Sequence, residues 1–176
     1  MLGNVARGSE LGHSTLAQAL ARSGYLVAAL RHPGDNWQDT SLRDGPGASR
    51  YFSQRPAQVS HVIGARVRAV VAMAPLGAPF TAQSLARIAV PTLLIQAEGD
   101  RFLMPRFHAG WVARHMPQAQ RVSVPKAWHF VFMDTPGMPL PSPDGDIGAD
   151  PPGFDRAAFL AQLGQWLPAF FDQAWR

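Results

Sequence analysis

Two residues in the second half of the chain could perform acid–base chemistry. Asp100 ends an apolar run that begins at Pro91, and His129 follows the next short apolar run, at residues 121–124. An acid after one strand and a histidine after the next follow the order Ser…Asp…His of one class of catalytic triad. In such a triad the histidine takes the serine proton, while the acid orients the imidazole and stabilises its charged form. Asp100 and His129 are therefore the candidate catalytic residues.

The nucleophile of that triad is missing, because no Gly-x-Ser-x-Gly sequence occurs. A serine hydroxyl needs a base within reach and a strained turn that presents it. Residues 12–16, Gly-His-Ser-Thr-Leu, imitate the first half of such a turn, but they end in leucine and no strand precedes them. We interpret Ser14 as a residue of a first helical turn, where serine satisfies free N–H groups. Ser60 and Ser84 have less supporting context, and nothing visible activates Ser9.

Metal and cofactor chemistry finds little support. His108 and His115 are seven residues apart, so they are not the i,i+4 pair of a zinc-binding helix. The spacing of Asp144, Asp146 and Asp150 lacks the glycine and glutamate of a calcium loop. The chain contains no cysteine, which excludes thiolate ligands, a thiol nucleophile and disulfides. We predict neither a metal nor a cofactor.

Length and composition favour one globular domain. The chain has 176 residues, of which 47% are hydrophobic and 16% charged, as expected of a buried α/β core. No apolar run is long enough to span a membrane, and the first residues lack the hydrophobic stretch of a signal peptide. We expect no membrane association. The compartment is undetermined, with the cytoplasm as the default.

The positive charge of the chain does not indicate a nucleic-acid partner. Lysine and arginine total 16, against 12 acidic residues. The basic residues are scattered singly, whereas a nucleic-acid surface gathers them on one face, often with aromatic residues. We therefore expect no nucleic-acid binding.

Short apolar runs and helix-like segments alternate along the chain. Such alternation predicts an α/β fold with a mostly parallel sheet of about four strands flanked by helices. The strands are expected at residues 25–30, 67–74, 92–97 and 121–124, and the helical segments at 13–23, 56–63, 84–88, 105–116 and from Asp155 onward. Residues 133–152, rich in proline, glycine and aspartate, are expected to form a long loop.

Several segments, in order, resemble bacterial dienelactone-hydrolase-like proteins. They are residues 11–13, 17–25, 27–29, 32–36, 55–60, 70–75 (Val-Val-Ala-Met-Ala-Pro) and 149–157 (Ala-Asp-Pro-Pro-Gly-Phe-Asp-Arg-Ala). The resemblance implies an α/β-hydrolase fold and cleavage of a small carboxylic ester or lactone by Ser–Asp–His chemistry. It also implies that Asp100 and His129 descend from the acid and the base of the triad.

The chain departs from that family in two places. The family's first strands and most of its oxyanion loop have no counterpart, and residues 64–66 lead directly into the strand at 67–74 where a strand, the serine turn and a helix are expected. The second gap is at least one βαβ-sized piece, about 30 residues. We therefore predict a single incomplete domain, inactive alone, in which 1–64 is a less ordered remnant and 65–176 a core. An exposed sheet edge could also cause self-association.

Three hypotheses of different class follow. The first is a truncated hydrolase of dienelactone-hydrolase type without activity of its own. The second is a working esterase that uses a substitute nucleophile or completes its site across a dimer. The third is a non-catalytic ligand- or protein-binding module derived from a hydrolase.

Overall fold

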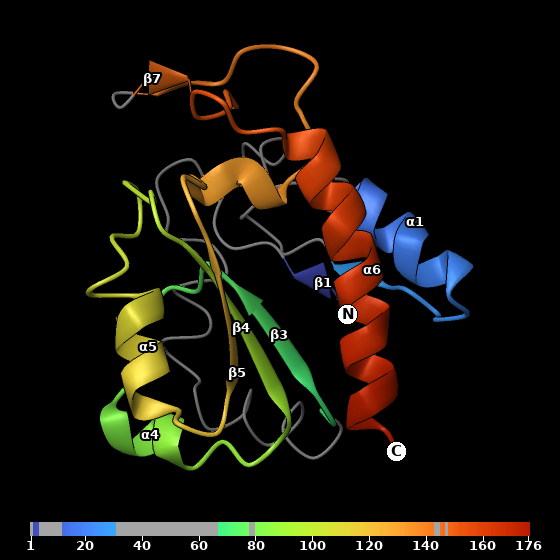
Figure 1. Ribbon diagram of the computed structural model, residues 1–176, viewed down its shortest axis with the longest axis vertical. Coiled ribbons are helices and arrows are strands. Elements are labelled where there is room, and N and C mark those ends of the chain that lie inside the picture. Colours follow the sequence, from blue (N-terminus) through green and yellow to red (C-terminus); the bar gives the residue numbers. More distant parts are fainter. Residues whose placement is uncertain (1, 4–11, 31–66, 78–79, 143–144, 147) are drawn as a thin grey trace, which may run out of the picture. The chain divides into compact units, whose positions relative to one another are not determined.

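The computed structural model describes residues 2–3, 12–30, 67–77, 80–142, 145–146 and 148–176. The chain divides into two compact units, Met1–Val67 and Arg68–Arg176, whose elements Figure 1 labels. The predicted helix at residues 56–63 lies outside the described residues. That residues 1–64 are less ordered than the rest stays a prediction.

The first unit contains one helix and one short parallel strand pair. Helix α1 spans Ser14–Arg22 and buries Leu16 and Leu20, as their i,i+4 spacing predicted. It ends at Gly24, whose φ of +90° favours glycine, the residue with no Cβ. Strands β1 (Leu2–Gly3) and β2 (Ala29–Leu30) pair in parallel.

The prediction of a buried strand over residues 25–30 was wrong for most of that run. Only Ala29–Leu30 forms a strand, and Leu26 is fully exposed. A continuous apolar run predicts a strand only where neighbours cover both of its faces. Among the described residues, the pairing partner of this run is the two-residue β1, which is too short to hold six residues.

The second unit is built on a parallel sheet, which confirms the predicted α/β fold. Its strands are β3 (Val70–Met73), β4 (Thr92–Ala97) and β5 (Gln120–Val124), in the order β3-β4-β5. Of the roughly four strands predicted, three thus form this sheet, while the fourth is reduced to β2 in its own pair. The predicted boundaries of β4 are correct, because proline and a Glu-Gly-Asp turn enclose that strand in the sequence.

Helices α4 (Ala82–Ala86) and α5 (Ala109–His115) lie on one side of these strands, and α6 (Arg156–Ala174) lies on the other (Figure 1). Strand β4 is buried on both faces, as its nearly unbroken apolar sequence requires. Its Leu94 packs in a cluster with Leu85, Val112, Ala113, Met116 and Ala119. Leu93 and Ile95 alternate to the opposite face and are also buried.

Helix α6 begins where the sequence predicted. The Asp155 side chain accepts a hydrogen bond of 2.9 Å from the Ala158 N–H, which satisfies one of the free donors of the first turn. A buried apolar stripe at helical spacing runs along the helix and includes Phe159, Leu163, Leu167 and Phe170. No helix among the described residues is both long and apolar enough to cross a membrane.

The loop predicted at residues 133–152 contains a little regular structure. A 3-10 helix, η1 (His129–Phe132), precedes it. Within it, β6 (Pro141–Ser142) and β7 (Gly145–Asp146) pair antiparallel. The remaining residues reach α6 without further regular elements among those described.

Candidate active site

The fold brings Asp100 and His129 together at the carboxyl ends of two neighbouring strands. Strand β4 ends at Ala97 and β5 at Val124, and these two residues are partners in the parallel register. The segments that leave the two strands therefore start side by side at one edge of the sheet. This is the edge at which open α/β sheets place their ligands.

Asp100 is fixed from three directions. Its Oδ2 lies 2.8 Å from Nδ1 of His129. Its Oδ1 accepts hydrogen bonds from the backbone N–H groups of Phe102 (2.9 Å) and Leu103 (2.7 Å). The side chain is only 2% exposed. Because both oxygens are used, the carboxylate has one orientation, and that orientation aims one oxygen at the imidazole.

His129 is the first residue of η1, and its ring is more accessible than its partner. The side chain is 20% exposed and packs between two phenylalanine rings, with centroid distances of 5.2 Å to Phe102 and 4.8 Å to Phe130. A carboxylate at Nδ1 favours the tautomer that carries its proton there. Nε2 then remains a base, and among the described residues nothing hydrogen-bonds to it. This is the arrangement needed to accept a proton from a hydroxyl.

The segments that carry the two residues are also fastened to each other. The Gly99 N–H donates to the Ala127 carbonyl oxygen at 2.9 Å. A Cβ on Gly99 would lie 3.0 Å from that oxygen, so the close approach depends on glycine. Further along, the Arg101 guanidinium lies 5.2 Å from the centre of the Trp128 ring. Sequence reasoning missed Gly99 and Phe102. The Glu-Gly-Asp turn in the sequence could have pointed to Gly99. No sequence pattern pointed to Phe102.

Among the described residues of the second unit, no candidate nucleophile forms a contact with His129. Ser14 is the first residue of α1, as predicted. Ser84 belongs to the capping box of α4, in which its Oγ accepts from the Thr81 N–H and its own N–H donates to Thr81 Oγ1. A helix cap, not catalysis, accounts for this hydroxyl. Ser9 and Ser60 lie outside the described residues.

Two other histidines, His108 and His115, and the acidic loop have structural contacts. His108 Nδ1 accepts from the Gly77 N–H at 3.2 Å, and His115 Nδ1 lies 2.9 Å from the Trp111 carbonyl. In the loop, Asp146 Oδ1 accepts from the N–H groups of Leu140 and Gly148. No group of three metal-ligating side chains occurs in the part of the chain that the structure describes.

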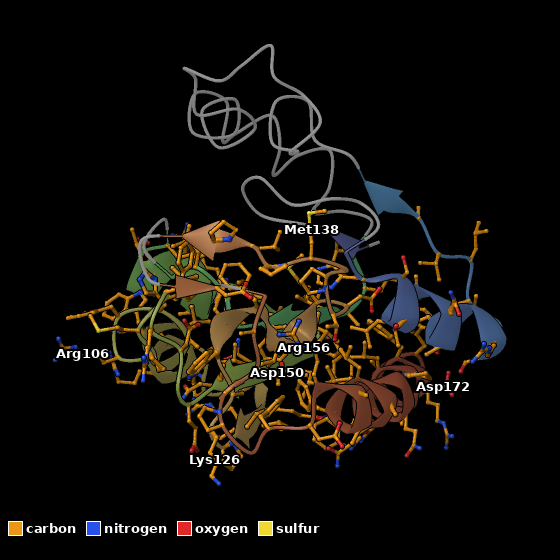
Figure 2. All side chains as sticks on the ribbon, turned by 90° about the horizontal axis from the view of Figure 1, so that it is seen from above. Arg106, Lys126, Met138, Asp150, Arg156 and Asp172 are labelled. Atoms are coloured by element: carbon orange, nitrogen blue, oxygen red, sulfur yellow. The ribbon has the colours of Figure 1, made fainter. Side chains whose placement is uncertain are left out.

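Arg156 holds the end of this loop against α6. Its Nε donates to Asp150 Oδ1 at 2.6 Å, and its Nη2 donates to the carbonyls of Gly148 (2.9 Å) and Ala149 (3.2 Å). Figure 2 labels both partners of the ion pair. A guanidinium that is 2% exposed needs such partners to offset its desolvation. The predicted loop after the histidine is thus anchored at its far end by a buried residue that sequence analysis did not single out.

The aromatic residues around the histidine divide between the core and the site. Phe132 is buried and meets Phe159 of α6 edge to face, with the centroids 5.5 Å apart. Phe130 is half-buried and lies against His129 and Phe102. Phe132 therefore belongs to the core, while Phe130 lines the site.

Comparison with known proteins supports the fold. No family model and no curated protein matches the chain. A solved structure described as a predicted CIB-like hydrolase from Thermoplasma acidophilum is similar, with a TM-score of 0.57 and 13% sequence identity over 95% of this chain and 86% of that chain. At this identity the likeness shows the fold alone. The chain has the α/β fold of a hydrolase-like structural neighbour.

Proposed function

We propose that this chain is an α/β-hydrolase of dienelactone-hydrolase type that keeps the acid and the base of a Ser–His–Asp triad and lacks the nucleophile. The observation that carries the proposal is the 2.8 Å contact between Asp100 Oδ2 and His129 Nδ1, with the carboxylate held by two backbone N–H groups. This orientation is the one in which the acid of a triad meets its histidine, and it supports the proposal.

The chemistry of the pair explains why it is inactive alone. An oriented imidazole removes a proton from a hydroxyl and later gives it to the leaving alkoxide. Both steps need a hydroxyl that attacks the ester carbonyl and carries the acyl group. Asp100 and His129 can supply the proton transfers only. Without the serine and the backbone donors of its turn, neither the acyl-enzyme nor its oxyanion is stabilised.

The dienelactone-hydrolase type rests on the resemblance of the segments, two of which belong to the second unit. Residues 70–75 form β3 and the turn that leaves it, where Ala74 has a φ of +41°. Residues 149–157 form the Arg156-anchored entry into α6. Their placement on either side of the Asp–His pair along the chain supports a common origin with such enzymes, whose substrates are small esters or lactones.

The test is ester hydrolysis by the purified chain, with two histidine variants beside it. The substrates are p-nitrophenyl butyrate for esters and dihydrocoumarin for lactones. His129→Ala removes the base, and His115→Ala removes a histidine of α5 outside the site. We expect the same low rate for all three proteins. We also expect no adduct by mass spectrometry after treatment with a fluorophosphonate, which labels activated serines.

One pattern of results would overturn the proposal. If the chain turns over substrate, and the rate is lost in His129→Ala but kept in His115→Ala, the site is a working esterase. The fluorophosphonate adduct would then identify the substitute nucleophile. A rate that also rises with the square of protein concentration would indicate a site completed across a dimer.

A further inference from the structure

An open hollow of about 520 Å³ lies between the segment that leaves β3 and helix α5. Its walls are formed by Gly77, Phe80, Arg106, Phe107, Trp111 and Arg114. Neither Asp100 nor His129 contributes to it. Its volume is within the range of small-molecule sites, about 300–1,000 Å³. The residues that line it are of two kinds, aromatic and cationic.

Neither of the two cations forms an ion pair among the described residues, and one of them, Arg114, is held by a hydrogen bond. Arg114 Nη2 donates to the Arg106 carbonyl at 2.9 Å. The Arg106 guanidinium lies 4.4 Å from the centre of the Phe107 ring, and that of Arg114 lies 5.9 Å from the Trp111 ring. No acidic side chain lines the hollow, and neither Arg106 nor Arg114 forms an ion pair in the part of the chain that the structure describes. The hollow therefore attracts an anion.

The aromatic rings offer an apolar surface beside these charges. Phe107 is 54% exposed and Phe80 is 44% exposed, so both rings present apolar area to solvent beside the charges. Trp111 is fixed more firmly, because it packs against the cluster between α4, α5 and β4. Its ring also contacts His115, with 3.8 Å between the centroids. A flat apolar body can lie against these rings while its charged end reaches a guanidinium.

The far wall of the hollow is closed by a tight contact. A Cβ on Gly77 would lie 2.9 Å from both Cα and O of His108, and the Gly77 N–H donates to His108 Nδ1. The β3 exit and the start of α5 are thereby locked together. The backbone of these two segments is thus in a fixed relative position before any ligand arrives, which lowers the entropic cost of binding there.

We propose that this hollow binds a small planar aromatic carboxylate. The guanidinium fork matches a carboxylate with two parallel hydrogen bonds, and the rings of Phe107 and Trp111 receive the aromatic body. Two arginines suit one or two negative charges, whereas a nucleic acid requires a longer row of cations. Figure 2 shows Arg106 extending outward from the ribbon at the edge of its unit, where it can meet a ligand from solvent. Binding here does not depend on ester hydrolysis.

The experiment is a titration with 2-naphthoate, followed by calorimetry and by amide shifts in NMR spectra, with no ester present. The test variant is Arg106→Gln/Arg114→Gln. The matched control is Arg87→Gln, which removes an exposed arginine at the end of α4, outside the hollow. Neutral 2-naphthalenemethanol is the ligand control. Circular dichroism checks that each variant is folded, and Phe107→Ser tests the aromatic wall if the double variant is not.

We expect saturable binding of 2-naphthoate, with shifts at Arg106, Phe107 and Trp111. Loss of charge-assisted hydrogen bonds should raise the Kd by about tenfold or more in the double variant. Arg87→Gln should change it by less than about twofold, and the neutral alcohol should bind at least about tenfold more weakly. No saturation, equal binding of the alcohol, or an equal effect of Arg87→Gln would each overturn the proposal. None of these results bears on whether Asp100 and His129 support hydrolysis.

Discussion

Asp100 is expected to stabilise the second unit mainly through its backbone contacts, with the histidine contributing less. Its Oδ1 accepts two N–H groups, at 2.9 and 2.7 Å, and its Oδ2 meets His129. Hydrogen bonds to a charged group contribute about 1.5–3 kcal/mol each when both partners are desolvated. Phe102 is 59% exposed, so water can reach its amide if the carboxylate is removed, and the lower end of that range applies.

Three variants separate these contributions. Asp100→Ala removes all three contacts, and we expect a loss of about 2–4 kcal/mol in the free energy of unfolding. Asp100→Asn keeps an oxygen for the two N–H groups and should lose about 1 kcal/mol, the worth of replacing a charged acceptor by a neutral one. His129→Ala leaves the backbone contacts intact and removes a ring that is 20% exposed. We expect it to lose about 1 kcal/mol or less.

Urea unfolding followed by circular dichroism gives these values. Hydrogen exchange of the Leu103 amide gives a local measure of the same bonds. In Asp100→Ala that amide should exchange much faster, and in His129→Ala it should stay close to its original rate. If His129→Ala destabilises the protein as much as Asp100→Ala does, the ion pair dominates and the reasoning is refuted.

Two further substitutions test the packing around the site. Gly99→Ala places a Cβ 3.0 Å from the Ala127 oxygen. We expect about 1–2 kcal/mol of destabilisation in urea unfolding, together with shifted NMR signals of His129. An unchanged histidine signal would mean that the two loops are not coupled. Leu163→Ala empties a position that is 0% exposed in α6 and should cost about 2–5 kcal/mol, while Gln162→Ala on the exposed face of the same helix should change stability by less than about 0.5 kcal/mol.

The elements of the second unit could be predicted from the sequence because local signals and burial agree there. Strand β4 is a nearly unbroken apolar run closed by turn residues, and α6 has both a capping aspartate and a stripe at helical spacing. The prediction failed for an apolar run whose strand structure depends on pairing with other parts of the chain. Residues 25–30 are as apolar as β4, yet four of the six are not in a strand and Leu26 is exposed.

The sequence predicted the two principal residues of the candidate site, Asp100 and His129. It did not predict the contacts that hold the segments around them. The position of an acid after one strand and a histidine after the next is visible in a sequence, because adjacent parallel strands end at the same edge. The contact of Gly99 with Ala127 depends on how two turns fold against each other. The burial of Arg156 depends on contacts with Asp150 and Gly148, which lie six and eight residues before it in the loop. No periodicity encodes such contacts.

The same contacts give the acid–histidine pair a structural reason to keep its geometry that does not depend on catalysis. Selection for hydrolysis would act on the imidazole and its free nitrogen, whereas selection for folding would act on the carboxylate that closes the turn after β4. Asp100 serves both purposes, since one of its oxygens faces His129 and the other binds the backbone of Phe102 and Leu103. The orientation of the pair is therefore fixed in part by hydrogen bonds that belong to the turn. It follows that a good Asp–His distance does not by itself show catalysis, and that the rate comparison between His129→Ala and His115→Ala is the test of activity.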